Sequence, residues 1–296
     1  MSRSGILVGV DGSSCSVAAV RWAAREATMR NVPLTLVDVV AVPVTDLPIL
    51  TLPATPIAGE LLEEREEDAR QMLSNAIRVA EDTAVGNGRP QIKAEVMCSA
   101  PAATLVKESK HAEMVVVGSR GQSTWHRPLL GSVSTALVHH AHCPVAVIPD
   151  ELSSQRHPLG SSVLLGVDGS PASELATAIA FDEASWRGAE LVALHAWNDA
   201  DTKHLQTMEW SAFESAGERN LAERLAGWQE RYPDVAVRRL VVWDHPARHL
   251  LDRAQRAQLV VVGSRGRGGF AGMLLGSVST AVVHAACVPV IVARRR

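Results

Sequence analysis

Two segments of the sequence place glycine and serine residues at the same spacing. Residues 115–136 read VVVGSRGQSTWHRPLLGSVSTA, and residues 260–281 read VVVGSRGRGGFAGMLLGSVSTA. In both, an apolar run leads to G-x-x-G, nine further residues, G-S and a helical pattern. The two flanks recur letter for letter while the residues between them differ, so the glycine and serine spacing is the shared feature.

This spacing suits the binding of an anion such as phosphate. A glycine at the end of a strand permits a positive φ and lets the main chain approach a ligand without an intervening Cβ. The later G-S opens a helix, whose first N–H groups and dipole attract an anion. We predict one phosphate cradle per segment, with the hydroxyls of Ser132, Ser134, Ser277 and Ser279 as extra donors. The expected cradle residues are Gly118, Ser119, Arg120, Gly121, Arg127, Gly131, Ser132, Val133 and Ser134, and then Gly263, Ser264, Arg265, Gly266, Gly276, Ser277, Val278 and Ser279.

A simpler interpretation treats these glycines as turn and capping residues only. It does not explain why two glycines and a serine recur at fixed spacing around a loop that diverges.

An aspartate follows the first strand of each half, in the motif VGVDGS. Asp11 and Asp168 occupy this position. In an open parallel sheet, ligands bind beyond the carboxyl ends of the strands, where the strand order reverses. A carboxylate there is expected to accept hydrogen bonds from ribose hydroxyls or a nucleobase. The alternative role is to cap the following helix, since D-G-S is also an ordinary strand-to-helix turn.

Short β-branched runs alternate with helical patterns in each half, which predicts an α/β fold with a parallel sheet covered by helices. Because the runs are almost continuously apolar, we expect the strands to be buried on both faces. Helices are predicted at 17–29, 59–81 and 247–257, among others. The predicted strands are 6–10, 34–39, 92–97, 114–117 and 145–148 in the first half, and 163–167, 191–196, 235–241, 259–262 and 290–292 in the second.

The chain is a tandem repeat. Its length of 296 residues is about twice that of one domain, and the VGVDGS motif returns 157 positions later, from Asp11 to Asp168. We predict one nucleotide-binding domain at residues 1–150, a polar linker at 151–160 and a second domain at 161–296. The extra length of the first half is assigned to the proline-rich loop at 41–56.

Charge and composition exclude several classes of function. The net charge is −3, with 29 basic and 32 acidic residues, which predicts no nucleic-acid or anionic-membrane partner. No apolar run approaches the ~20 residues of a membrane span, and the N-terminus lacks a signal-peptide pattern, so a cytoplasmic protein is expected. Four scattered cysteines are expected to be buried free thiols; they are Cys15, Cys98, Cys143 and Cys287.

The repeated motifs resemble the universal stress protein family in its tandem, ATP-binding form, whose signature is G-2x-G-9x-G-[ST]. The resemblance covers nearly the whole chain except the linker and the loop at 41–56. It implies two Rossmann-like five-stranded sheets with strand order 3-2-1-4-5, and ATP, with Mg²⁺ on its phosphates, across the first and fourth strands. By position, Asp11 and Asp168 would face the adenosine and the main chain at Val39 and Ala196 would contact adenine. Gly9 and Gly166 would allow close approach beneath it.

Two departures from the family pattern concern the same sites. The family's Gly-x-Pro after the third strand is replaced by Ser99-Ala100-Pro101 and by Asp244-His245-Pro246. Arg127 precedes the Leu-Leu-Gly-Ser step in the first half, whereas the second half has Gly272. The two sites are therefore expected to hold phosphate with different strength.

Three functions remain open at this point. The favoured one is an ATP-binding regulator of stress response or growth, with an unidentified protein partner and at most slow hydrolysis. The second is a dedicated ATPase or phosphotransferase, but the P-loop, G-x-S-x-G and H-E-x-x-H motifs are lacking. The third is a flavin or dinucleotide carrier. The cluster HHAHC at 139–143 is assigned to a helix end and not to a metal, because adjacent histidines project to different sides.

The fifth strands, PVAVIP and PVIVAR, predict how the halves associate. Each would be an unprotected β-branched edge, and pairing one edge with the other would cover both. We expect an intrachain pseudo-dimer, and the association of whole chains into a homodimer is left open.

Overall fold

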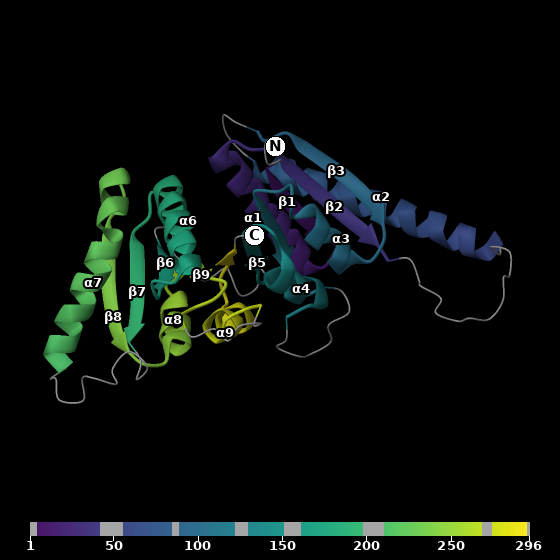
Figure 1. Ribbon diagram of the computed structural model, residues 1–296. Helices are drawn as coiled ribbons and strands as arrows, with labels where there is room; N and C mark the ends of the chain where they lie inside the picture. The colour runs from purple at the N-terminus through teal and green to yellow at the C-terminus, as the bar shows by residue number, and fades with distance from the viewer. Residues whose placement is uncertain are drawn as a thin grey trace.

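The computed structural model describes residues 5–41, 56–84, 89–121, 130–150, 161–197, 210–267 and 274–294 (Figure 1). The predicted linker at 151–160 lies outside these ranges, as does all but the two end residues of the loop at 41–56. The first half comprises β1 (Ile6–Val10), α1 (Ser14–Arg30), β2 (Leu34–Val40), α2 (Pro56–Thr83), β3 (Ile92–Cys98), α3 (Pro101–Glu108), β4 (Met114–Gly118), α4 (Ser132–His140) and β5 (Val145–Ile148). The second half comprises β6 (Ser162–Val167), α6 (Pro171–Arg187), β7 (Leu191–Trp197), α7 (Trp210–Arg231), β8 (Val237–Trp243), α8 (Pro246–Ala254), β9 (Ala257–Gly263), α9 (Ser277–Ala285) and β10 (Val290–Ala293).

The described strands form one sheet in the order β3-β2-β1-β4-β5-β10-β9-β6-β7-β8. Each half therefore has the order 3-2-1-4-5 and is parallel throughout, which confirms the predicted α/β class and topology. The strand order reverses between β1 and β4, and between β6 and β9. These reversals are the places where an open α/β sheet binds ligands.

Two apolar cores lie on the two faces of the sheet. One face packs against α1, α2, α6 and α7, through residues such as Ala23, Leu73 and Phe181. The other packs against α3, α4, α8 and α9, through residues such as Leu105 and Leu250. Helices on both faces explain why the central strands are apolar at nearly every position.

The third strand of each half does not follow the prediction that strands are buried on both faces. β3 and β8 are the outer strands of the sheet, and their side chains are half-buried or exposed. Lys93, Glu95, Arg238 and Arg239 are exposed there, as is common at a sheet edge. Some bounds also differ. For example, β8 begins at Val237, and α8 ends at Ala254 because Ala257 already belongs to β9.

The two halves join through their fifth strands, as predicted. β5 and β10 pair antiparallel, with Val145 opposite Val292 and Val147 opposite Val290. The halves are thus related by a pseudo-twofold axis, and their strands run in opposite directions where the two halves meet. Figure 1 shows the two halves side by side, with β5 and β9 near the junction.

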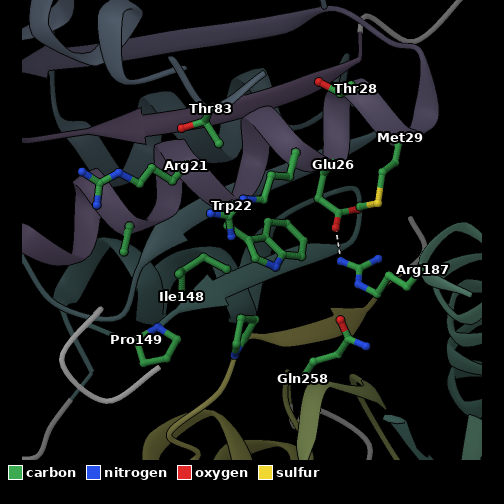
Figure 2. Close-up of a pocket in the computed structure, with 13 residues that line it drawn as sticks. Arg21, Trp22, Glu26, Thr28, Met29, Thr83, Ile148, Pro149, Arg187 and Gln258 are labelled. Atoms are coloured by element: carbon green, nitrogen blue, oxygen red, sulfur yellow. Dashed lines mark hydrogen bonds and ion pairs between the residues drawn. The ribbon is translucent and has the colours of Figure 1, made fainter. Parts of the chain in front are cut away.

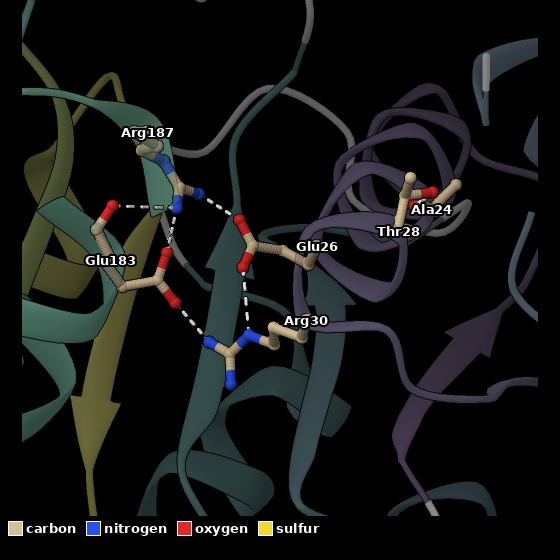
Figure 3. A network of polar contacts seen from close by, with 6 residues as sticks. All are labelled: Ala24, Glu26, Thr28, Arg30, Glu183 and Arg187. Carbon is tan, nitrogen blue, oxygen red and sulfur yellow. Dashed lines mark hydrogen bonds and ion pairs between the residues drawn. The ribbon is translucent and has the colours of Figure 1, made fainter. Parts of the chain in front are cut away.

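A group of four charged residues spans the junction beside this seam. Glu26 on α1 and Arg187 on α6 form an ion pair across the halves (Figure 2). Arg30 pairs with Glu26 at 3.2 Å and with Glu183, and Arg187 also pairs with Glu183 (Figure 3). We call these residues the junction ion-pair cluster.

Both carboxylates of this cluster are fully buried. Burial, together with the nearby charge of Glu26, raises the pKa of Glu183 to about 7, although Arg187 and Arg30 act in the opposite direction. The cluster therefore combines a strong mutual attraction with a high desolvation cost.

Two further observations bear on the sequence predictions. None of the described helices is long and apolar enough to cross a membrane.

The cysteines are all free thiols, but only Cys15 and Cys143 are buried; Cys98 and Cys287 are exposed, contrary to expectation. Cys98 ends the outer strand β3, which accounts for its exposure.

Candidate functional site

A cavity of about 430 Å³ opens at the carboxyl ends of β1, β2 and β4, at the reversal of strand order in the first half. Most of the residues predicted from the sequence line it. They are Gly9, Asp11, Val39, Gly118, Arg120, Gly121, Gly131, Ser132, Val133 and Ser134. The glycine loop, the start of α4 and the first aspartate are thus brought together around one space.

Asp11 organises the turn between β1 and α1. Its Oδ1 accepts a hydrogen bond from the backbone N–H of Ser13 at 3.0 Å and another from the Ser13 hydroxyl at 2.7 Å. Ser13 in turn caps α1 by accepting from the N–H of Ser16. The capping alternative for Asp11 is therefore realised through Ser13, while the carboxylate still lines the cavity.

The glycines of the loop do not use the positive φ that a glycine permits. Among the described glycines, the turn residues Gly12 and Gly169 do, with φ of 74° and 75°, whereas Gly118, Gly121 and Gly131 do not. The left-handed conformation is needed immediately after the aspartate and not in the phosphate loop. The presence of glycine in the loop must therefore depend on whether the surrounding atoms leave room for a Cβ.

Gly118 and Gly263 are required by packing within the chain. A Cβ on Gly118 would lie 2.7 Å from the Cβ of Cys15 and 2.8 Å from its carbonyl carbon. A Cβ on Gly263 would lie 2.8 Å from the carbonyl carbon of Ala172. Both glycines let a central strand end against the first turn of α1 or α6.

Gly121 and Gly266 adjoin the aspartates. A Cβ on Gly121 would lie 2.6 Å from Oδ2 of Asp11, and one on Gly266 would lie 2.5 Å from Oδ2 of Asp168. An alanine at either position would therefore force the aspartate side chain to move from its place beside the loop.

Gly131 and Gly276 are different, because nothing in the described chain requires a glycine. A Cβ on either would meet its nearest neighbours at 3.5 Å, which is an ordinary contact. Both have φ near −70° and form the N-cap of α4 or α9 without a side-chain hydrogen bond to the helix. Serine, aspartate or asparagine is preferred at an N-cap for that bond, so glycine leaves the first N–H groups of the helix open towards the cavity.

The serine hydroxyls divide into two kinds. Ser134 donates to the carbonyl of Gly118 at 2.6 Å, and Ser279 donates to the carbonyl of Gly263 at 2.5 Å. Both side chains are buried, and in this structure their hydroxyl protons are directed to the strand ends and not to the cavity. Ser132 and Ser277 are exposed at the first position of each helix.

The remaining loop residues are placed as follows. Ser119 does not line the cavity; its backbone accepts from Gly131 at 2.8 Å and its hydroxyl lies 3.7 Å from the Cys15 sulfur. The side chain of Arg120 is exposed, and its carbonyl accepts from the Ser13 hydroxyl at 3.3 Å. Arg127 and Gly272 lie outside the described residues.

The second half repeats these contacts. Asp168 accepts from the N–H of Ser170 at 2.9 Å, and Ser170 donates to the carbonyl of Arg265 at 3.0 Å. The N–H of Gly276 donates to the carbonyl of Ser264 at 2.8 Å. The remaining residues predicted for this site lie at positions equivalent to those of the first half; they are Gly166, Ala196, Gly263, Gly266, Ser277, Val278 and Ser279.

Asp38 is a cavity residue that the sequence prediction missed. It lies on β2 opposite Val10 and is only 8% exposed. Burial and the nearby charge of Asp11 raise the pKa of Asp38 to about 6. A single acid inside the apolar run LTLVDVV was the available signal.

The equivalent position in the second half is a histidine. His195 lies opposite Val167, is 5% exposed, and its Nδ1 is 2.7 Å from the carbonyl oxygen of Val167. The floors of the two sites therefore carry different titratable groups.

The HHAHC segment lies at the end of α4, as expected. Arg294, next to β10, donates to the carbonyls of Val138 and Ala141, the latter at 3.1 Å. The described residues contain no group of three histidine, cysteine or acidic side chains arranged to hold a metal ion.

Comparison with known proteins identifies the fold and its motifs. The model of the Universal stress protein family matches residues 3–149 and again residues 161–294. The chain belongs to the universal stress protein family. It is 52% identical over 293 residues to the universal stress protein Rv2623 of Mycobacterium tuberculosis, covering 99% of this chain and 97% of that protein. It is 51% identical over 292 residues to a universal stress protein of Mycolicibacterium smegmatis, again covering 99% and 97%.

A solved structure shows the same tandem fold. A universal stress protein from Archaeoglobus fulgidus aligns over 100% of both chains with a TM-score of 0.73 and 22% identity. At this identity the likeness concerns the fold alone.

Proposed function

We propose that each half of this universal stress protein binds one molecule of ATP. The phosphates would lie on the glycine loop and the start of α4 or α9, and the adenosine would lie between Asp11 or Asp168 and the ends of the first two strands. The cavity volume of about 430 Å³ in the first half suits a ligand of this size.

The observation that carries this proposal is the glycine at the N-cap of α4 and of α9. Gly131 and Gly276 have no packing or dihedral reason to be glycine, and their helices begin without a side-chain cap. A Cβ there would stand between an anion and the open N–H groups of the helix. Phosphate binding at helix N-termini supplies the missing reason.

Mg²⁺ is proposed to enter with the nucleotide. This ion keeps several waters and is usually held by phosphates and one or two carboxylates. Asp11 in the first site and Asp168 in the second are the carboxylates placed to take part, and the ion would neutralise phosphate charge.

We further propose that occupancy, and not turnover, is the functional output. The carboxylates that line the described cavity are Asp11 and Asp38. Oδ1 of Asp11 already accepts two hydrogen bonds from Ser13, and Asp38 is buried in the floor. Neither carboxylate is positioned to take a proton from an attacking water, so hydrolysis would be slow. The protein would then act as a nucleotide-dependent regulator of a protein partner.

Calorimetry with MgATP on the double variant Gly131→Ala Gly276→Ala tests the proposal. We expect affinity to fall about tenfold or more, with an unchanged circular dichroism spectrum and melting temperature. The matched control is Gly227→Ala on α7, where the added Cβ meets nothing within 4 Å. Unchanged affinity in the double variant would show that these glycines do not face a phosphate.

A further inference from the structure

A second cavity, of about 480 Å³, lies at the junction of the two halves and is separate from the glycine loops. It runs along α1 and is closed by residues of both halves. Trp22 and Ile148 come from the first half, and Arg187, Gln258 and Pro289 come from the second. The antiparallel pairing of β5 and β10 brings these residues together, so the cavity exists only in the joined molecule.

Cations dominate the charge of this cavity. Arg21, Arg25 and Arg187 line it, against the single carboxylate of Glu26. Glu26 already pairs with Arg30 and Arg187 in the junction ion-pair cluster, so its charge is compensated. The side chain of Arg25 is exposed and makes no ion pair or hydrogen bond with another described residue. Arg25 thus brings to the cavity a positive charge that no described residue pairs with.

The spacing of Arg21 and Arg25 adds to this conclusion. Residues four apart on a helix are neighbours, and like charges at that spacing repel each other. Both residues line the same cavity. An oxyanion beside them would offset the repulsion, and guanidinium donors such as that of Arg25 suit carboxylate and phosphate oxygens.

The other side of the pseudo-twofold axis shows that the fold does not require these residues. The positions on α6 equivalent to Arg21, Trp22 and Arg25 are Ala178, Ile179 and Asp182. Asp182 accepts a hydrogen bond from the Tyr232 hydroxyl at 2.5 Å. Two helices with the same place in the fold therefore present a basic, aromatic surface on one side and neither feature on the other.

The remaining walls of the cavity are apolar and aromatic. Figure 2 shows the Trp22 indole in the middle, between Arg21 on one side and the Glu26–Arg187 pair on the other. The guanidinium of Arg187 lies 6.0 Å from the centre of the indole ring. Ile148, Pro149 and Pro289 complete the apolar wall.

We propose that the junction cavity binds a small organic anion, with its carboxylate or phosphate group on Arg21 and Arg25 and its flat apolar body against Trp22. This site is distinct from the two nucleotide sites and does not depend on them. It occurs once in the chain, because the equivalent surface of α6 lacks both the cations and the indole.

Titration of the full chain with 4-bromophenyl phosphate tests the proposal by calorimetry. We expect binding by the unaltered protein, about tenfold weaker binding by Arg25→Asp, and a similar loss in Trp22→Ile. Both substitutions introduce the residue that α6 carries at the equivalent position, so the helix tolerates them. Arg219→Asp, an exposed site on α7 with the same change of charge, should bind as the unaltered protein does.

The probe carries a phosphate that the glycine loops could also hold, so its position must be established. The double variant Gly131→Ala Gly276→Ala should keep its affinity for the probe, whatever happens to ATP. In crystals soaked with the probe, the anomalous signal of bromine should lie beside Trp22. Bromine only at the glycine loops, equal affinity in Arg25→Asp, or no binding at all would overturn the proposal.

Discussion

At the scale of single residues, the glycines of the repeated motif meet different requirements. Gly118 and Gly263 allow a strand to end against the backbone of a neighbouring helix, whereas Gly131 and Gly276 have room for a Cβ. The sequence shows all of them alike. Only the packing distances separate glycines that the fold needs from glycines that a ligand would need.

Gly118→Ala should therefore destabilise the protein itself. The new Cβ would approach backbone and Cβ atoms of Cys15 closer than 3.0 Å, and these atoms cannot move without shifting α1. We expect a loss of about 1–3 kcal/mol, as for other overpacked cores, seen as a lower melting temperature. Gly131→Ala is the matched variant and should melt as the unaltered protein does. Equal melting of all three proteins would contradict the packing role of Gly118.

Asp38 predicts a pH dependence of stability. Its pKa is raised to about 6 in the folded protein, so the folded state binds this proton more tightly than the unfolded state does. The stability that this proton contributes is present at low pH and is lost as pH rises through about 6. Asp38→Asn lacks this term, and its stability relative to the unaltered protein should increase by about 1–2 kcal/mol between pH 5 and 7.5.

Denaturant unfolding at the two pH values measures this difference. Glu95→Gln, at an exposed carboxylate on β3, serves as the control and should change stability little at either pH. A pH-independent effect of Asp38→Asn would mean that the carboxyl of Asp38 is already ionised at pH 5.

At the scale of elements, much of the fold could be predicted from the sequence. Eight strands of the sheet were expected within one residue of their observed bounds at both ends because their apolar runs are uninterrupted and occur twice; β8 differs by two positions at both ends, and β9 differs by two at its first residue. The exposure of β3 and β8 was missed because burial depends on whether a strand has neighbours on both sides. Polar residues such as Lys93 and Arg238 were the local signal.

The candidate site was predictable in part for a similar reason. Spacing identified the loop, the helix starts and Asp11, which all line the cavity. It could not show that the Ser134 hydroxyl turns towards the carbonyl of Gly118, since a serine at a helix start can face either way. Nor could it show that Asp38 reaches the cavity, because strand alternation alone assigns that side chain to the core.

The helices α1 and α6 meet through the junction ion-pair cluster, which predicts a second pH effect. The pKa of Glu183 is raised to about 7, so the folded state binds this proton more tightly than the unfolded state does. The resulting stabilisation is fully present at a pH below the ordinary pKa of a glutamate, and it is lost as the pH rises through about 7. Glu183→Gln cannot lose that proton. Its melting temperature relative to the unaltered protein should therefore rise between pH 5 and pH 8.

The control for this effect is Glu190→Gln, because Glu190 makes an exposed ion pair with Arg238 at 3.4 Å. Surface pairs contribute little to stability, so its melting temperature should follow that of the unaltered protein. If Glu183→Gln also follows the unaltered protein at both pH values, Glu183 is ionised throughout and the arginines outweigh its burial.

At the scale of the whole molecule, the fifth strands determine how the halves associate. Val145, Ala146 and Val147 pair with the equivalent strand of the other half. An isolated first half, residues 1–150, would leave this strand uncovered. We expect it to form a homodimer through β5, because two copies can reproduce the antiparallel seam.

Analytical ultracentrifugation of this fragment checks the prediction. Val147→Pro removes a backbone N–H that faces β10, because the alternate residues Pro144 and Ile148 face β4, and it should give a monomer with the same circular dichroism spectrum. A folded fragment that stays monomeric at high concentration would show that the seam is too weak to form between separate chains.

The seam also has a consequence for how the molecule behaves on dilution. Two separate subunits joined by four-residue strands would dissociate at low concentration, whereas two halves of one chain meet at an effective concentration set by their connection. The junction, with its arginine-lined cavity and its ion pairs, therefore stays assembled however few copies of the protein are present. Its state depends on what binds to it and not on how much of the protein there is.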